Sequence, residues 1–185
     1  AWQAGLKGGS VAGERNLTAY PAVTNVYLSP HAAATTASPP WAAATTWVYW
    51  GQMYFNGGTY HFAENIDDNT WLKIGDTVYI NDAVWNAPVK SGNVLLAEGW
   101  HPIEMRFGNG GGGAGPVGGS GWTATKGFGY NIDGPDTNQG GDYAFPLDNG
   151  AMSLFRYDDG TGFGSPEAAT YAATDVALST AKLNG

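Results

Sequence analysis

Cysteine is absent from this 185-residue chain, which excludes disulfide bonds, thiol nucleophiles and cysteine metal ligands. Charged residues are scarce, at 13% of the chain, and 16 acidic residues against 8 basic ones leave a formal net charge of -8. That sign repels a phosphate backbone, so nucleic acid is a poor partner. No apolar run approaches the ~20 residues that a membrane helix needs, so we expect no membrane span.

Aromatic residues and glycine are abundant instead. Aromatics make up 14% of the chain, and it holds 29 Gly and 10 Pro. This composition is typical of many short strands joined by tight turns. The sequence therefore predicts an all-β protein, an antiparallel β-sandwich or barrel with long Gly-rich loops and little helix. Its length fits one domain over 1–185, with the strongest pattern over 46–157 and a tail or edge strand over 166–185.

Strand patterns recur at short intervals. Asn56-Gly57-Gly58 predicts a turn, and Gly99 a chain reversal. In the segment 101–107, core-type residues alternate with Glu104 and Arg106, which predicts that these two face water. The strands expected from such patterns lie at 16–18, 25–28, 46–50, 52–55, 59–62, 71–74, 76–81, 93–97, 101–107 and 152–157.

The chain begins at Ala1 without an initiator Met. Removal of a signal peptide and excision of one module from a larger protein would both give such a start, and both interpretations stay open. Few Lys and Glu with abundant Thr, Gly, Asn and Trp is typical of extracellular bacterial β-modules, so we expect a secreted or cell-surface location.

Asp67 and Asp68 stand side by side in a polar break between two strand patterns, which places them at the tip of a hairpin. Adjacent carboxylates repel unless water, a basic group or a metal neutralises them. One interpretation is a calcium ion bound by both acids with help from further oxygen ligands, since calcium takes six to eight of them. The other is that Asp67 caps the turn by accepting backbone N–H bonds while Asp68 is solvated.

Exposed aromatic rings offer a second route to sugars. A pyranose presents an apolar C–H face on which a Trp ring stacks, while Asn and Asp bind its hydroxyls. Trp71, beside the acidic pair, and Trp85 lie near predicted turns. The predicted carbohydrate-binding residues are Asp67, Asp68, Asn69, Trp71 and Trp85, with Asp67 and Asp68 also as metal ligands.

Little in the sequence favours catalysis. His31, His61 and His101 lack metal-ligand spacing. Adjacent carboxylates such as Asp67 and Asp68 tend to diverge, and nothing separates their pKa values, so they make a poor glycosidase pair. We expect no enzymatic activity.

The order of motifs resembles the protective-antigen β-sandwich domain of bacterial toxins, glycosidases and fungal adhesins. The resemblance covers about 46–116 and rests on an aromatic strand, Asp67-Asp68, Leu72-x-Ile74-Gly75, Gly92, the segment 95–104 and the glycine run 108–115. It implies a β-sandwich, and in the fungal lectins paired acids in the equivalent loop hold a calcium ion that also binds sugar hydroxyls. This chain departs from the family pattern at two places. Asn69 stands where members often carry Gly, and the order here is Gly75-Asp76 where many members carry Asp before the Gly.

Three functional hypotheses follow. The first is a non-catalytic extracellular carbohydrate-binding module for a polysaccharide or glycan, lectin-like or adhesin-like, with calcium as a candidate cofactor. The second is a structural cell-surface subunit that self-associates through edge strands or the tail. The third is an accessory or catalytic domain of a glycoside hydrolase.

Overall fold

The described part of the chain is built almost entirely from strands. The computed structural model describes residues 2–23, 25–29, 43–66, 68–84, 88–111, 127–137 and 154–158, and these contain no α-helix. The ten strands are β1 (Trp2–Ala4), β2 (Leu6–Ala12), β3 (Asn25–Ser29), β4 (Thr45–Asn65), β5 (Asn69–Ile74), β6 (Thr77–Asp82), β7 (Val89–Lys90), β8 (Val94–Asn109), β9 (Gly127–Ile132) and β10 (Phe155–Asp158). The all-β antiparallel prediction is confirmed.

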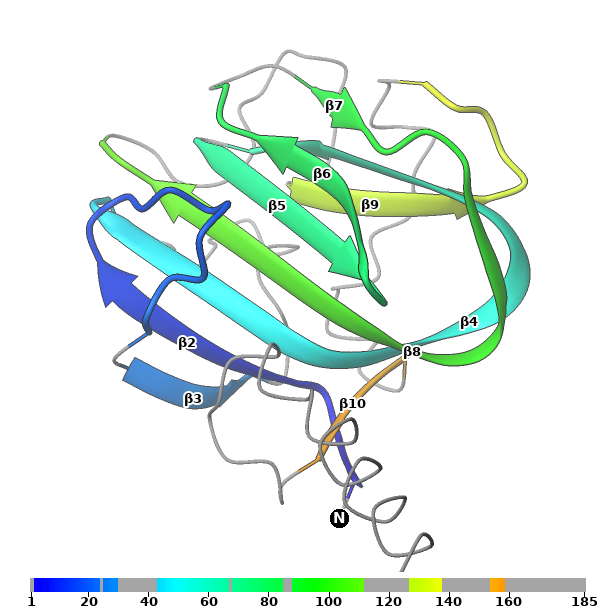
Figure 1. The fold of residues 1–185 in the computed structure, drawn as a ribbon, viewed down its shortest axis with the longest axis horizontal. Coiled ribbons are helices and arrows are strands. Elements are labelled where there is room, and N and C mark those ends of the chain that lie inside the picture. The colour runs from blue at the N-terminus through cyan, green and yellow to red at the C-terminus, as the bar shows by residue number, and fades with distance from the viewer. Residues whose placement is uncertain are drawn as a thin grey trace, which may run out of the picture.

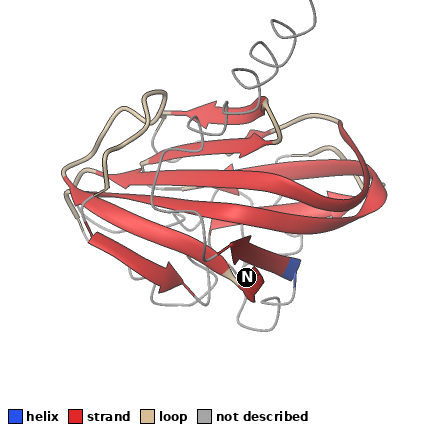
Figure 2. Cartoon of the chain, turned by 60° about the horizontal axis from the view of Figure 1, so that its bottom comes forward, coloured by secondary structure: helices blue, strands red, loops and turns tan. Residues whose placement is uncertain are grey.

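Two long strands organise the sheet. β4 pairs with β8 along nearly its whole length, from Thr45↔Asn109 to Tyr60↔Val94. The first half of β4 also pairs with β2, and its last residues pair with β9 and β7. In Figure 1 the ribbon formed by β4 and β8 curves back on itself, so that the end of β4 returns above the strands beside its start. Figure 2 shows the resulting stack of strands.

Glycines let β4 and β8 bend without ending. Gly57 and Gly58 have φ of 81° and 124°, and Gly99 has φ of 134°. The turn predicted at Asn56-Gly57-Gly58 and the reversal predicted at Gly99 are both wrong, because Asn56 and Gly58 pair with the same partner strand. Glycine takes these positive φ values at little cost, so the strands curve and stay paired.

The core fills the space inside the bend. Phe55 contacts Tyr60 and Phe62 edge-on, at ring distances of 4.9 and 6.2 Å. Their packing ties the two halves of β4 together across the bend. The other fully buried large side chains are Leu6, Tyr49, Met53, Ile66, Leu72, Ile80, Met105 and Phe107.

The N-terminal segment, residues 13–23, covers the outer face of the sheet. Leu17 within it is 3% exposed, and the main-chain oxygen of Leu17 accepts a 2.7 Å hydrogen bond from Arg106 Nη1. The strand predicted at 16–18 is therefore wrong, whereas the edge strand predicted at 25–28 is confirmed as β3, which among the described strands pairs only with β2.

Residues 13–23 also explain why a second prediction, that Glu104 and Arg106 face water, is wrong. Glu104 and Arg106 were expected to face water, and they are 4% and 3% exposed. They do point away from the core, as the alternation requires, but residues 13–23 lie over them. Arg106 Nε donates to Glu104 Oε1 at 2.6 Å, so the pair is neutralised in place.

Gly51 of β4 lies close to β10 and β2. A Cβ there would meet the Arg156 carbonyl oxygen at 2.5 Å and Leu6 Cδ2 at 2.8 Å. We expect Gly51→Ala to lower the free energy of unfolding by about 1 to 3 kcal/mol through overpacking. Thermal unfolding measures it, with Gly111→Ala as the control because a Cβ at Gly111 meets nothing within 4 Å. Equal stability of the two variants would contradict this account of Gly51.

Candidate functional site

Asp68, in the connection between β4 and β5, forms hydrogen bonds to residues at the end of β8. The residues between β4 and β5 do not close a hairpin, because β4 and β5 lie on opposite sides of β8. The predicted hairpin tip is therefore wrong, although a break between strands does fall there. Asp68 N donates to Gly108 O at 2.8 Å, and Gly110 N donates to Asp68 Oδ2 at 2.7 Å. Asp68 thus accepts a backbone hydrogen bond from a residue 42 positions away.

Further polar side chains lie around Asp68. We call this region, made up of Asp68, Glu14, Asn69, Asn109 and Gly110, the tip. Asn69 opens β5 opposite Gly108 and is 7% exposed, and Asn109 ends β8 and is 1% exposed. A Cβ on Gly110 would contact the carboxylates of both Glu14 and Asp68, so the two acids approach the same glycine. Carboxylate and amide oxygens are the groups that bind hydroxyls or a hard cation.

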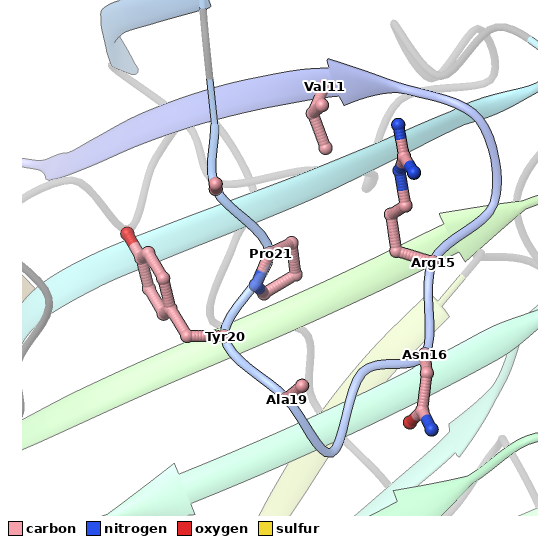
Figure 3. A pocket seen from close by; sticks show the side chains of 7 residues that line it. Val11, Arg15, Asn16, Ala19, Tyr20 and Pro21 are labelled. Carbon is pink, nitrogen blue, oxygen red and sulfur yellow. The ribbon is translucent and has the colours of Figure 1, made fainter.

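Two hollows flank the N-terminal segment. The first, of about 400 Å³, runs between this segment and the ends of β5 and β6, and its lining is mostly polar: Glu14, Arg15, Asn16, Leu17, Thr18, Asn69, Asn81, Asp82 and Ala83. The second, of about 380 Å³, opens on the other side towards Val11 of β2. Figure 3 shows its lining, with Arg15 and Tyr20 on opposite sides of the looped segment.

The predicted site residues have different fates. Asp68 lies at the tip with Asn69 next to it, and Asn69 lines the larger hollow. Asp67 and Trp85 fall outside the described residues, so their roles stay predictions. Trp71 does not present the open ring that stacking on a sugar needs. It is 5% exposed, and the Arg106 guanidinium lies 3.7 Å from its ring centroid.

Metal ligands are few in the described part of the chain. Within those ranges, no group of three or more His, Asp or Glu side chains is placed to hold a metal ion. Glu14 and Asp68 supply two carboxylates at the tip, fewer than calcium needs without backbone carbonyls and water. Calcium binding by Asp67 and Asp68 therefore stays a prediction.

Glu64 and Asp82 form a buried pair of acids that was not predicted from the sequence. Glu64, at the end of β4, is 0% exposed, and its Oε2 accepts 2.9 Å bonds from Ile66 N and Thr70 Oγ1. Burial raises the pKa of Glu64 well above its ordinary value, and the neighbouring Asp82 adds to the effect. Burial also raises the pKa of Asp82. Glu64 Oε1 and Asp82 Oδ2 meet no donor among the described residues, which a proton shared between the two carboxyl groups would remedy.

Comparison with known proteins adds two kinds of finding. No family model matches the chain. In sequence it is 33% identical over 114 residues to an alpha-agarase of Alteromonas agarilytica and 38% identical over 90 residues to an alpha-agarase of Thalassotalea agarivorans. These matches cover 62% and 49% of this chain but 7% and 6% of the agarases. The shared region is a small part of each relative.

Solved structures give the class of fold. The chain is similar to an anti-sigma factor domain-containing protein, with a TM-score of 0.60 at 14% identity over 86% of this chain and 49% of that one. It is similar to the PA14 domain of the MpAFP antifreeze protein, with a TM-score of 0.57 at 13% identity over 89% and 96%. A third similar structure is the Epithelial Adhesin 6 A domain of Candida glabrata, determined with Galβ1-3GlcNAc, with a TM-score of 0.52 at 13% identity over 89% and 94%.

These similarities establish a fold shared with PA14 domains. The β-sandwich that the resemblance implies agrees with this fold, whereas membership of the protective-antigen family stays a prediction because no family model matches.

Proposed function

We propose that this chain is a non-catalytic carbohydrate-binding module that acts outside the cell on a neutral polysaccharide. The observation that carries the proposal is the sequence identity of 33% and 38% between this chain and two alpha-agarases. The matched region makes up 7% or less of those enzymes. A segment that small, with a fold of its own, is typical of a module appended to a polysaccharide-degrading enzyme. The fold similarity to an adhesin domain determined with a disaccharide supports the same ligand class.

The tip supplies chemistry that suits hydroxyl groups. Glu14, Asn69 and Asn81 line one hollow, and the carboxylates of Glu14 and Asp68 both approach Gly110. Such convergent amide and carboxylate groups fix the orientation of a sugar by hydrogen bonds. Calcium would bridge the acids of the tip to the sugar hydroxyls, with Asp67 and Asp68 as ligands.

The buried acids do not favour hydrolysis. Glycosidase carboxyl groups stand roughly 5 to 9.5 Å apart, on either side of a bond that the substrate brings between them. Glu64 is inaccessible and interacts directly with Asp82. We therefore assign this pair a structural role.

Binding to agarose beads tests the function. We expect the chain to be retained and then eluted by soluble agaro-oligosaccharides, with no release of reducing sugar. Absence of retention on agarose and on a panel of other polysaccharides would overturn the proposal.

Asp68→Asn tests the tip. The new amide oxygen can still accept from Gly110 N, so the variant removes the charge and keeps the local bond. We expect affinity for agaro-oligosaccharides to fall at least about tenfold, as loss of a central binding residue does, and to lose its sensitivity to EDTA. Isothermal titration calorimetry measures both effects.

Asp76→Asn is the matched control, because it removes the same charge from an exposed position between β5 and β6. If both variants bind like the unmodified chain, the tip is not the binding site. If the unmodified chain ignores EDTA, the calcium role falls.

A further inference from the structure

A second set of aromatic side chains lies on the outer face of the sheet, away from the tip. The register places Ala4 opposite Arg156, Arg156 opposite Gln52, and Gln52 opposite Pro102. Residues two positions along each strand share the same face. The outer face of β1, β10, β4 and β8 therefore carries Trp2, Arg156, Gln52, Tyr54, Trp100 and Glu98, which we call the aromatic platform.

The side chains of the platform hold one another in place. The Arg156 guanidinium lies 3.9 Å from the Trp2 ring centroid and 4.3 Å from that of Trp100. Its Nε donates to Gln52 Oε1 at 2.7 Å. Tyr54 meets the Trp100 ring edge-on at 5.4 Å. These contacts fix the rings before any ligand arrives, which lowers the entropy cost of binding.

Exposure distinguishes these rings from that of Trp71. Trp2 is 50% exposed, and Trp100 and Tyr54 are partly exposed, whereas Trp71 is buried. Contiguous exposed rings beside polar groups are typical of surfaces that bind a ligand or partner. Arg156 has five N–H donors and Glu98 is exposed, so hydroxyl partners are at hand beside the apolar rings.

Charge and dimensions select the occupant. The four strands span about 14 Å at their usual spacing, long enough for more than one sugar ring. The face carries Arg156 against Glu98 and Asp158, within a chain of net charge -8. It therefore lacks the positive excess that a sulfated or uronic polymer needs.

We infer that the aromatic platform is a second binding surface for a neutral polysaccharide, on which sugar rings stack on the faces of Trp2 and Trp100 that Arg156 does not cover, while Arg156, Gln52 and Glu98 bind their hydroxyls. The inference rests on the proposed function for its class of ligand, but it uses a different surface and needs no metal. The alternative is that Arg156 and the two tryptophans only fasten β1 and β10 to the rest of the sheet.

The test measures binding of agaro-oligosaccharides by calorimetry on an Asp68→Asn background in EDTA, which weakens binding at the tip. We expect binding to persist there. Trp2→Ala and Trp100→Ala should each weaken it at least about tenfold. Trp100→Tyr, which keeps a ring, should retain most of the affinity. Leu95→Ala is the control for loss of an exposed apolar side chain, because Leu95 is 81% exposed on another stretch of β8.

Each outcome separates the two proposals. Full affinity of Trp2→Ala and Trp100→Ala, with a lowered melting temperature, would overturn the platform and leave the fastening role. Loss of all binding in the Asp68→Asn background would overturn the platform while the proposed function stands. Tighter binding of a sulfated galactan than of agarose would overturn the choice of ligand. Failure of the unmodified chain to bind any polysaccharide would overturn the proposed function itself.

Discussion

Arg106→Met is expected to lower the free energy of unfolding by about 3 to 5 kcal/mol, the usual cost of removing one partner from a buried ion pair. Glu104 would keep its charge at 4% exposure without the guanidinium 2.6 Å away. The variant would also lose the bond to Leu17 O and the contact with the Trp71 ring. Urea unfolding followed by tryptophan fluorescence measures the change.

Controls separate this pair from a general effect of charge. Arg15→Met removes an exposed arginine and should change stability by no more than about 0.5 kcal/mol. Adding Glu104→Gln to Arg106→Met should recover part of the loss, because it removes a buried charge that the guanidinium no longer balances. A loss in Arg106→Met no larger than in Arg15→Met would contradict the importance of the pair.

The same variant should loosen the N-terminal segment. Arg106 reaches this segment through Leu17 O at 2.7 Å and lies 5.3 Å from the Tyr20 ring centroid. Both hollows beside the tip take part of their lining from residues 14–22. We therefore expect Arg106→Met to show faster amide exchange in 17–22 and weaker sugar binding at the tip. The buried arginine would then support the site by holding this segment in place.

The strands could be predicted from the sequence because their information is local. Alternation of Ile103, Met105 and Phe107 identifies the core face of β8, and the three side chains are indeed buried. The fate of the opposite face was not predictable, since it depends on a segment about 90 residues earlier in the chain. Alternation tells which side a residue faces but not what covers that side.

The bends were missed for a related reason. A glycine pair after an aromatic strand is typical of a turn, and the same residues also allow a strand to curve. Pairing with β8 on both sides of Gly57 decides in favour of curvature. Because β4 curves, its end arrives over β5, and this brings Glu64 to Thr70 and Asp82.

The site was predicted in part. The position of Asp68 between strands follows from local polarity, but its bond to Gly110 depends on β8 ending beside β5. The closeness of Trp71 to the acids in sequence predicts a stacking ring beside them. Its ring instead lies beneath Arg106, whereas the exposed rings of Trp2 and Trp100 are brought together by strand order.

Glu64→Gln is expected to change how stability depends on pH. Burial raises the pKa of the Glu64 carboxyl in the folded chain, and Asp82 shifts in the same direction. A raised pKa means that the folded state holds the proton more tightly than the unfolded state. The contribution of Glu64 to the free energy of unfolding is then complete below the pKa of the unfolded state. Above that pKa it falls by about 1.4 kcal/mol per pH unit, until the pH passes the pKa of the folded state.

Glutamine removes this loss and preserves the contacts. Its carbonyl can accept from Ile66 N and Thr70 Oγ1, and its amide can donate to Asp82 without a shared proton. We expect the variant to match the unmodified chain near pH 4.5 and to exceed it by at least about 1 kcal/mol at pH 8. Urea unfolding at pH 4.5, 6, 7 and 8 gives the profile, and Glu98→Gln, at an exposed position, should leave it unchanged. If Glu64→Gln instead loses the same amount of stability at every pH, Glu64 is ionised in the folded chain. Glu64 would then contact Thr70 and Asp82 as a carboxylate, without a proton shared with Asp82.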